Sequence, residues 1–239
     1  MRTIGLIGGM SWESTVSYYQ AINRGIQAGL GGLHSAKIVL ESVDFATIAQ
    51  MQSDSEWDKA GVVLAESAAR LQTAGADCVL ICTNTMHNVA EQVENAIDVP
   101  LLHIADATAH ALKADHIGKV GLLGPRFTRE QDFYKGRLTE HHGIEVVTPS
   151  EHSRTIVHDV IYQELCLGQI RDDSCQQYIT IIDELAQQGA QAVILGCTEI
   201  ALLVKPKDTA MPLYDTTAIH AEAAVDFALK TKNSRSQSV

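Results

Sequence analysis

The sequence predicts an α/β fold made of two similar Rossmann-like domains, each built on a parallel sheet. Apolar, β-branched runs alternate with amphipathic helical patterns along the chain, which is typical of parallel βαβ units. Residues 75–85 (GADCVLICTNT) align without a gap with residues 189–199 (GAQAVILGCTE), at an offset of 114. Residues 3–8 (TIGLIG) align with residues 119–124 (KVGLLG) at an offset of 116. We interpret both repeats as an internal duplication of a half of roughly 110 residues, an ordinary domain size.

The first half starts with a strand over residues 3–7 that runs into glycines. Ser11 is a natural N-cap, and apolar residues recur at helical spacing as far as Ile26. Glycines in residues 29–32 end this helix. The elements expected next are a strand at 37–43, a helix at 58–73, a strand at 78–82, a helix at 87–96 and a strand at 99–104.

The second half repeats this order. Tyr134 stands in its first helix where Tyr18 stands in the first half. Its expected elements are a strand at 119–123, a helix at 127–138, a strand at 143–147, a helix at 174–188 and a strand at 193–195. A last helix at 218–229 is expected to pack back on the first half, and residues 230–239 are expected to fray.

These repeats set the expected domain boundaries. We expect a first domain of residues 1–104 plus about 208–239, and a second domain of residues 105–207. The small polar residues that follow the repeated strands lie at the carboxyl edge of their sheets, where open α/β sheets bind ligands. We therefore expect the active site in the cleft between the two domains.

Composition limits the partners of the chain. The formal net charge of −11 disfavours nucleic acid and anionic membrane surfaces. No apolar run approaches the roughly 20 residues that a membrane helix needs, and the N-terminus does not resemble a signal peptide. The five cysteines are scattered without CxxC spacing, so neither a zinc site nor a disulfide framework is indicated. Free thiols fit a reducing cytosol, and a cytoplasmic protein is expected.

Cys197 is the strongest candidate for a catalytic residue. It ends an apolar strand, and Thr198 and Glu199 follow where a helix is expected to start. A helix N-terminus would lower the pKa of the thiol and make thiolate available. The remaining cysteines fit small core residues: Cys78, Cys82, Cys166 and Cys175.

The turn of Thr83, Asn84 and Thr85 is the counterpart of Cys197 in the first half. It fits a helix cap, and it also fits a cradle for a carboxylate made of hydroxyls, an amide and backbone N–H groups. The two interpretations are compatible, because a capping turn can hold an anion in front of it. Thr83 itself aligns with Cys197.

Nucleotide and metal sites are not indicated. The loop at residues 8–11 lacks both the dinucleotide fingerprint and the P-loop pattern, and fits a close approach to a small ligand. The ten histidines show no metal-ligand spacing. His87, His103 and His220 lie near predicted strand ends and fit either general acids or bases or structural histidines.

Three motifs resemble the cofactor-independent aspartate/glutamate racemases. They are residues 4–15 (IGLIGGMSWEST), 83–87 (TNTMH) and 195–200 (LGCTEI), and the resemblance runs nearly end to end. It implies a homodimeric amino-acid racemase that uses no pyridoxal phosphate or metal. In that family one cysteine from each domain faces the substrate, one as thiolate base and the other as thiol acid, on opposite faces of the α-carbon.

The sequence departs from this family at three positions. Thr83 replaces the first cysteine, and its hydroxyl is too weak an acid to supply a base at neutral pH. We therefore expect one-sided catalysis. The resemblance implies that the second cysteine, Cys197 here, deprotonates the L-enantiomer. Phe45 and Cys166 stand where the family would place basic residues for the side-chain carboxylate. Gln52 and Thr198 are then the expected anchor, and Met10 is a further expected substrate-lining residue.

Two other functions fit the same residues. One is a single-cysteine decarboxylase or isomerase of a small dicarboxylic acid, in which only one face is protonated. The other is a protein that binds a dicarboxylate without turning it over. The intact motif around Cys197 favours the racemase.

Overall fold

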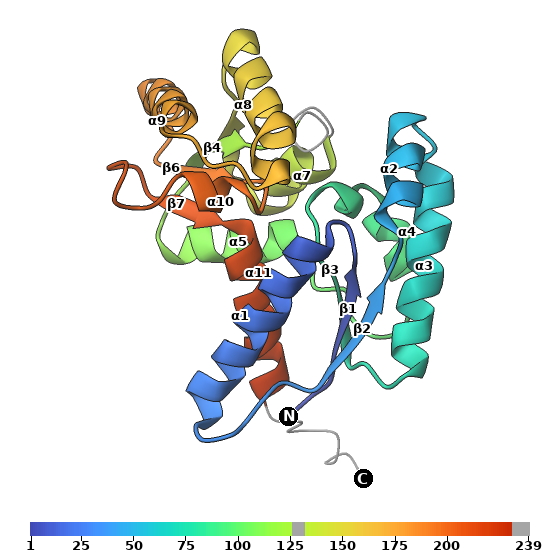
Figure 1. The fold of residues 1–239 in the computed structure, drawn as a ribbon. Coiled ribbons are helices and arrows are strands. Elements are labelled where there is room, and N and C mark those ends of the chain that lie inside the picture. Colours follow the sequence, from blue (N-terminus) through green and yellow to red (C-terminus); the bar gives the residue numbers. More distant parts are fainter. Residues whose placement is uncertain (126–131, 231–239) are drawn as a thin grey trace. The chain divides into compact units, whose positions relative to one another are not determined.

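The computed structural model describes residues 1–125 and 132–230 (Figure 1). They form two compact units. The first comprises residues 1–82, 89–102 and the chain from His220, and the second comprises residues 83–88 and 103–219. The division expected from the sequence stays a prediction, and these units differ from it in placing 83–88, 103–104 and 208–219 with the second half.

The first unit is a three-stranded parallel sheet of order β2-β1-β3 between helices. Its elements are β1 (Ile4–Gly8), α1 (Trp12–Leu30), β2 (Ile38–Ser42), α2 (Phe45–Ser53), α3 (Trp57–Thr73), β3 (Cys78–Ile81) and α4 (Ala90–Glu94). In Figure 1, α1 and α3 lie on opposite faces of this sheet. Ser11 caps α1, as expected, because its hydroxyl oxygen accepts the backbone N–H of Ser14.

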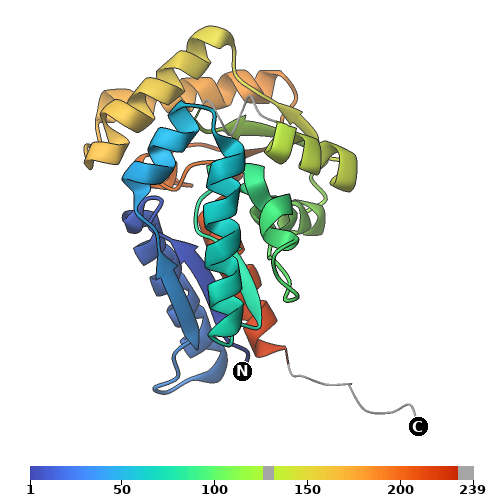
Figure 2. The ribbon, with the colours of Figure 1, turned by 90° about the vertical axis from the view of Figure 1, so that its right-hand side faces the viewer.

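The second unit is a four-stranded parallel sheet of order β5-β4-β6-β7. Its elements are η1 (Thr85–Val89), α5 (Ile104–Ala114), β4 (Lys119–Leu123), α7 (Asp132–Gly136), η2 (Arg137–His141), β5 (Glu145–Val147), α8 (Glu151–Gln163), η3 (Leu165–Leu167), α9 (Asp172–Gln187), β6 (Ala192–Leu195), α10 (Ile200–Leu203), β7 (Leu213–Asp215) and the start of α11 (Thr216–Leu229). Helices α8 and α9 cover one face and α5 the other (Figure 2).

The two sheets repeat one strand register, which confirms two similar parallel-sheet halves. Ile4 pairs with Cys78 in the first sheet, and Val120 pairs with Ala192 in the second. These positions are related by the offsets 116 and 114 that the sequence repeats give. In each half the strand order places the first strand between the second and the third.

Side-chain contacts are repeated along with the strands. Asp77 Oδ2 accepts the backbone N–H of Thr3 at 2.8 Å, and Gln191 Oε1 accepts that of Lys119 at 3.0 Å. Gly75 and Gly189 begin the two turns with φ of 94° and 88°, a backbone conformation that favours glycine. The duplication is therefore preserved in individual hydrogen bonds.

Each half contributes its last helix to the other unit. Helix α5 follows the first half in sequence, but it packs in the second unit, where Thr108 accepts the hydroxyl of Tyr134 at 3.2 Å. Helix α11 follows β7, but it packs in the first unit, where His220 Nδ1 lies 2.8 Å from the hydroxyl of Tyr18. Both tyrosines are fully buried at equivalent positions.

Three expected elements differ from the structure. The helix expected at 87–96 is divided into the 3-10 helix η1 and the short helix α4, which ends at Glu94. The strand expected at 99–104 is reduced to one bridge between Val79 and Leu101, because α5 already begins at Ile104. The helix expected at 127–138 is described only from Asp132 on, as α7 and η2, and residues 126–131 lie outside the described residues, as do 231–239. Within the described ranges, no helix is both long and apolar enough to cross a membrane.

Candidate active site

The turn after β3 holds the candidate residues of the first half. Thr83 and Thr85 are partly exposed, whereas Asn84 is 5% exposed. Cys82, one residue earlier, is fully buried in the core, as strand alternation predicts. By contact this turn belongs to the second unit, which also contains Cys197 and Thr198.

Thr216 connects Asn84 to the end of β6. The Thr216 hydroxyl donates to the carbonyl oxygen of Leu195 at 3.0 Å, and the amide nitrogen of Asn84 donates to the same hydroxyl at 3.1 Å. Leu195 lies two residues before Cys197. The structure therefore links the Thr83–Asn84 turn, through a residue of α11, to the end of β6, two residues before Cys197.

This network fixes which way the Asn84 amide points. A threonine hydroxyl has one hydrogen, and Thr216 uses it on the Leu195 carbonyl, so toward Asn84 it can only accept. The atom of Asn84 beside Thr216 must then be Nδ2. Its Oδ1 is buried and has no hydrogen-bond partner among the described residues. The turn thus contains a buried acceptor whose hydrogen-bonding capacity is not used by any described residue.

Cys197 lies beside a carboxylate. The residue is partly exposed, and its Sγ donates to Glu199 Oε2 at 3.0 Å. Burial raises the pKa of the Cys197 thiol well above its ordinary value, and the negative charge of Glu199 and its hydrogen bond raise it further. The expectation that a helix start would lower this pKa is wrong, since α10 has four residues and begins only at Ile200.

The other cysteines differ in exposure. Cys78 is buried, and Cys175 is partly exposed with its Sγ 3.4 Å from the Leu203 carbonyl oxygen. The expectation that Cys166 is a core residue is wrong, because its side chain is exposed. Cys166 follows α8 closely and interacts electrostatically with Cys197. Burial, with both thiols and Glu199 nearby, raises the pKa of Tyr162 to about 12.

The three histidines near the strand ends, His87, His103 and His220, are buried, and each makes hydrogen bonds to the backbone. His87 Nε2 accepts the backbone N–H of Ile104 at 3.2 Å, and His103 Nδ1 accepts that of Ala105 at 3.1 Å, so both cap α5. His220 Nε2 donates to the Leu102 carbonyl at 2.6 Å, and burial lowers its pKa to about 4. In these contacts all three fit the structural interpretation.

Met10 and Gln52 belong to the first unit. Met10 lies two residues after the end of β1 and is 3% exposed. Gln52 lies in α2 and is partly exposed. Thr198, in the second unit, accepts a hydrogen bond from the hydroxyl of Thr217 at 3.3 Å. The structure therefore brings together Asn84 and the β6 end, and Thr198 with Thr217. Substrate-binding roles for Met10, Gln52, Thr83, Asn84, Thr85 and Thr198 remain proposals.

Sequence reasoning missed Thr216 and Thr217. They open α11 directly after β7, and Asp215 caps them through its Oδ1, which accepts the Thr217 N–H at 2.9 Å. The signal was available, because small polar residues follow an apolar strand here as they do at Thr83 and Thr198.

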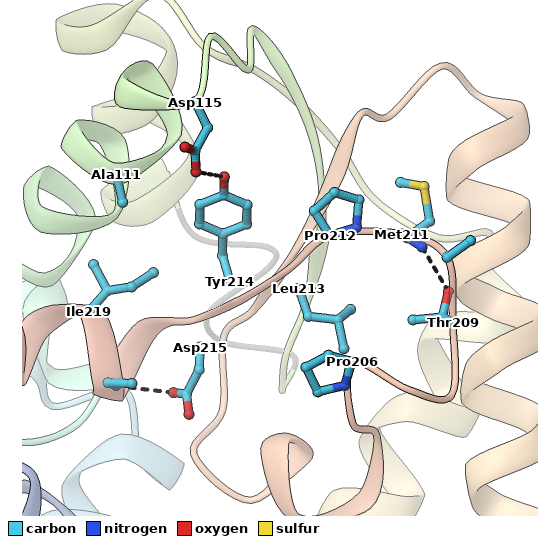
Figure 3. Close-up of a pocket in the computed structure, with 12 residues that line it drawn as sticks. Ala111, Asp115, Pro206, Thr209, Met211, Pro212, Leu213, Tyr214, Asp215 and Ile219 are labelled. Carbon is cyan, nitrogen blue, oxygen red and sulfur yellow. Dashed lines mark hydrogen bonds between the residues drawn. The ribbon is translucent and has the colours of Figure 1, made fainter.

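A surface pocket of about 620 Å³ lies elsewhere in the second unit (Figure 3). It is lined by the end of α5, the loop before β7 and the start of α11. Its acidic groups are engaged, since Asp115 accepts the Tyr214 hydroxyl at 2.5 Å and Asp215 caps α11. None of the candidate site residues lines it. In residues 1–125 and 132–230, no cluster of three or more His, Cys, Asp or Glu residues could hold a metal ion.

Comparison with known proteins identifies the family. Residues 7–224 match the Asp/Glu/hydantoin racemase family. The broad specificity amino-acid racemase RacX of Bacillus subtilis is 23% identical over 230 residues, covering 93% of this chain and 96% of that protein.

Solved structures agree with this match. A candidate Asp/Glu racemase from Yersinia pestis is 55% identical with a TM-score of 0.93, covering 96% of this chain and 100% of that one. An aspartate racemase homologue from Pyrococcus horikoshii OT3 is 30% identical with a TM-score of 0.84, covering 95% and 99% of the two chains. The chain belongs to the Asp/Glu/hydantoin racemase family and is an isomerase.

Proposed function

We propose that this protein racemises aspartate or glutamate by transferring the α-proton through the Cys197 thiol, faster from the L-enantiomer than from the D-enantiomer. The observation that carries the proposal is the buried, unpartnered Oδ1 of Asn84. An amide oxygen only accepts hydrogen bonds, so the ligand group that faces it is a donor. The α-ammonium group of an amino acid is such a donor, whereas a dicarboxylic acid in its ionised form offers none.

Glu199 completes the proposed base. In the resting enzyme the thiol donates its hydrogen to the Glu199 carboxylate at 3.0 Å. When this proton passes to Glu199, the thiolate is left to take the α-proton of the substrate, which restores the thiol and leaves a carbanion. Because burial and Glu199 raise the pKa of Cys197, the thiolate is scarce but strongly basic, as removal of a weakly acidic C–H proton requires.

Thr83 makes the proposed reaction one-sided. Its hydroxyl stands at the position equivalent to Cys197 and can donate or relay a proton to the carbanion. It cannot readily remove a proton from the D-enantiomer, because an unactivated hydroxyl is a weak base. We expect the side-chain carboxylate to be held by neutral donors, among them Gln52 and Thr198, and we expect a cytoplasmic homodimer that needs no cofactor.

Isotope exchange tests the proposed function. Wild-type protein in heavy water should replace the α-proton of L-aspartate or L-glutamate with deuterium, and Cys197→Ser should not. A panel of other amino acids defines the specificity. Release of carbon dioxide from a disubstituted malonate without deuteration of either amino acid would instead establish a single-cysteine decarboxylase. Binding of aspartate without exchange would establish a dicarboxylate-binding protein.

A further inference from the structure

We infer that His87 is a positioning residue that sets the orientation of Thr83 and Asn84 for the proposed proton transfer. This inference rests on the proposed function. His87 lies four residues after Thr83, in η1, and is 2% exposed. Its contacts join three points of the chain: the two carbonyl groups of the Thr83–Asn84 turn and the first N–H of α5.

The partners of the ring determine its protonation. The backbone N–H of Ile104 points to Nε2 at 3.2 Å, so Nε2 carries no hydrogen and acts as acceptor. The other nitrogen, Nδ1, lies 2.8 Å from the carbonyl oxygen of Thr83, which can only accept. His87 is therefore neutral and protonated at Nδ1, and in this form it cannot take up a substrate proton without losing the Ile104 contact.

The same residue holds the next carbonyl group. The backbone N–H of His87 donates to the Asn84 carbonyl at 3.1 Å. With the oxygens of Thr83 and Asn84 both held by His87, the peptide groups on either side of Asn84 are fixed. Asn84 is 5% exposed, and its Nδ2 is held by Thr216. His87 and Thr216 thus fix the backbone and the side chain of Asn84, and the acceptor Oδ1 is left for the ligand.

Two substitutions separate this role from simple capping of α5. In His87→Gln the amide can reach the Nε2 position and accept the Ile104 N–H, but the hydrogen bond to Thr83 is lost. In His87→Asn the shorter amide can replace Nδ1–H and donate to Thr83, but the contact with Ile104 is lost. A positioning role predicts that His87→Gln harms substrate recognition more, whereas a capping role predicts that His87→Asn is the more damaging change.

The readout is the recognition of the substrate ammonium group. The dissociation constants of L-aspartate and succinate are measured by calorimetry in the full-length Cys197→Ser protein, so that no turnover occurs. Because one hydrogen bond to a charged group separates the two ligands, aspartate should bind about 10- to 100-fold more tightly. His87→Gln should reduce this ratio to that of Asn84→Ala, and His87→Asn should retain most of it.

A double substitution completes the test. If His87 acts through Asn84, then adding His87→Gln to Asn84→Ala changes the ratio no further. An unchanged ratio in His87→Gln, or an additive loss in the double variant, overturns the inference. Imidazole ¹⁵N chemical shifts give a readout independent of substrate: protonation at Nε2 near neutral pH also overturns it. The two failures can be told apart. If the wild-type protein neither binds aspartate or glutamate nor exchanges their α-proton, and His87 still carries its proton on Nδ1, then the proposed function is wrong and the hydrogen-bond assignment of His87 stands.

Discussion

Replacing Thr216 by valine tests the network that links the Asn84 side chain to the end of β6. The substitution keeps the shape of the side chain and removes only the hydroxyl. Thr216 is fully buried, so no water can replace the lost partner. The carbonyl oxygen of Leu195 and the Nδ2 of Asn84 both lose a hydrogen bond of about 3 Å.

The expected loss follows from these two groups. A buried polar group left unpaired costs about 1–3 kcal/mol, so two of them should lower the free energy of unfolding by about 2–6 kcal/mol. The amide of Asn84 also loses the contact that fixes its orientation. Misplacement of a substrate-orienting group by about 1 Å can cost about 100-fold in rate, so kcat/KM should fall by about 10- to 100-fold.

Thr108→Val is a matched control. Thr108 is equally buried, and its hydroxyl also makes two hydrogen bonds, to the Ile104 carbonyl at 2.8 Å and from Tyr134 at 3.2 Å. It should lower the urea-unfolding free energy by a smaller amount, because the Ile104 carbonyl keeps its backbone hydrogen bond within α5, and it should leave kcat/KM unchanged. The reasoning is refuted if the unfolding free energy of Thr216→Val lies within about 0.5 kcal/mol of the wild-type value. It is also refuted if Thr216→Val and Thr108→Val lose kcat/KM equally.

Three further predictions follow from individual contacts. Glu199→Gln removes the charge that raises the pKa of Cys197, so more of the thiol is ionised at neutral pH. The Cys197 side chain of the folded protein should then be alkylated faster by iodoacetamide, and an unchanged rate contradicts this. The pKa of His220 is about 4 in the folded protein and about 6.5 in the unfolded chain. The unfolded chain therefore binds a proton first as the pH falls, so the stability that neutral, buried His220 contributes is complete above pH 6.5 and is lost between pH 6.5 and 4. This loss should reach about 3 kcal/mol by urea unfolding and vanish in His220→Gln. In Gly121→Ala the new Cβ would lie 2.7 Å from Leu185 Cδ1, so the unfolding free energy should fall by about 1–3 kcal/mol; an unaltered value contradicts the close strand–helix packing.

Much of the fold could be predicted because the duplication is written in local patterns. The offset that aligns Thr83 with Cys197 also relates the strand registers of the two sheets. Helical periodicity and the Ser11 cap predicted α1, and buried apolar runs predicted β3 and β6. These signals depend only on residues close to one another in the sequence.

The remaining features depend on distant partners. Residues 99–104 look like a strand, but His87 and His103 supply acceptors that start α5 at Ile104. The thiol of Cys197 was expected to be acidified by a helix start, but its surroundings are set by burial and by the rotamer of Glu199. The role of Thr216 depends on Asn84, which is 132 residues away. No local pattern contains such information.

The central claim is that one reactive thiol, Cys197, serves one face of the substrate while Thr83 serves the other. Separate measurement of α-deuterium incorporation into the L- and D-enantiomers tests it most directly. We predict fast exchange from the L-enantiomer, slow exchange from the D-enantiomer, and faster D-exchange in Thr83→Cys. Equal and rapid exchange from both enantiomers by the wild-type protein would contradict the claim.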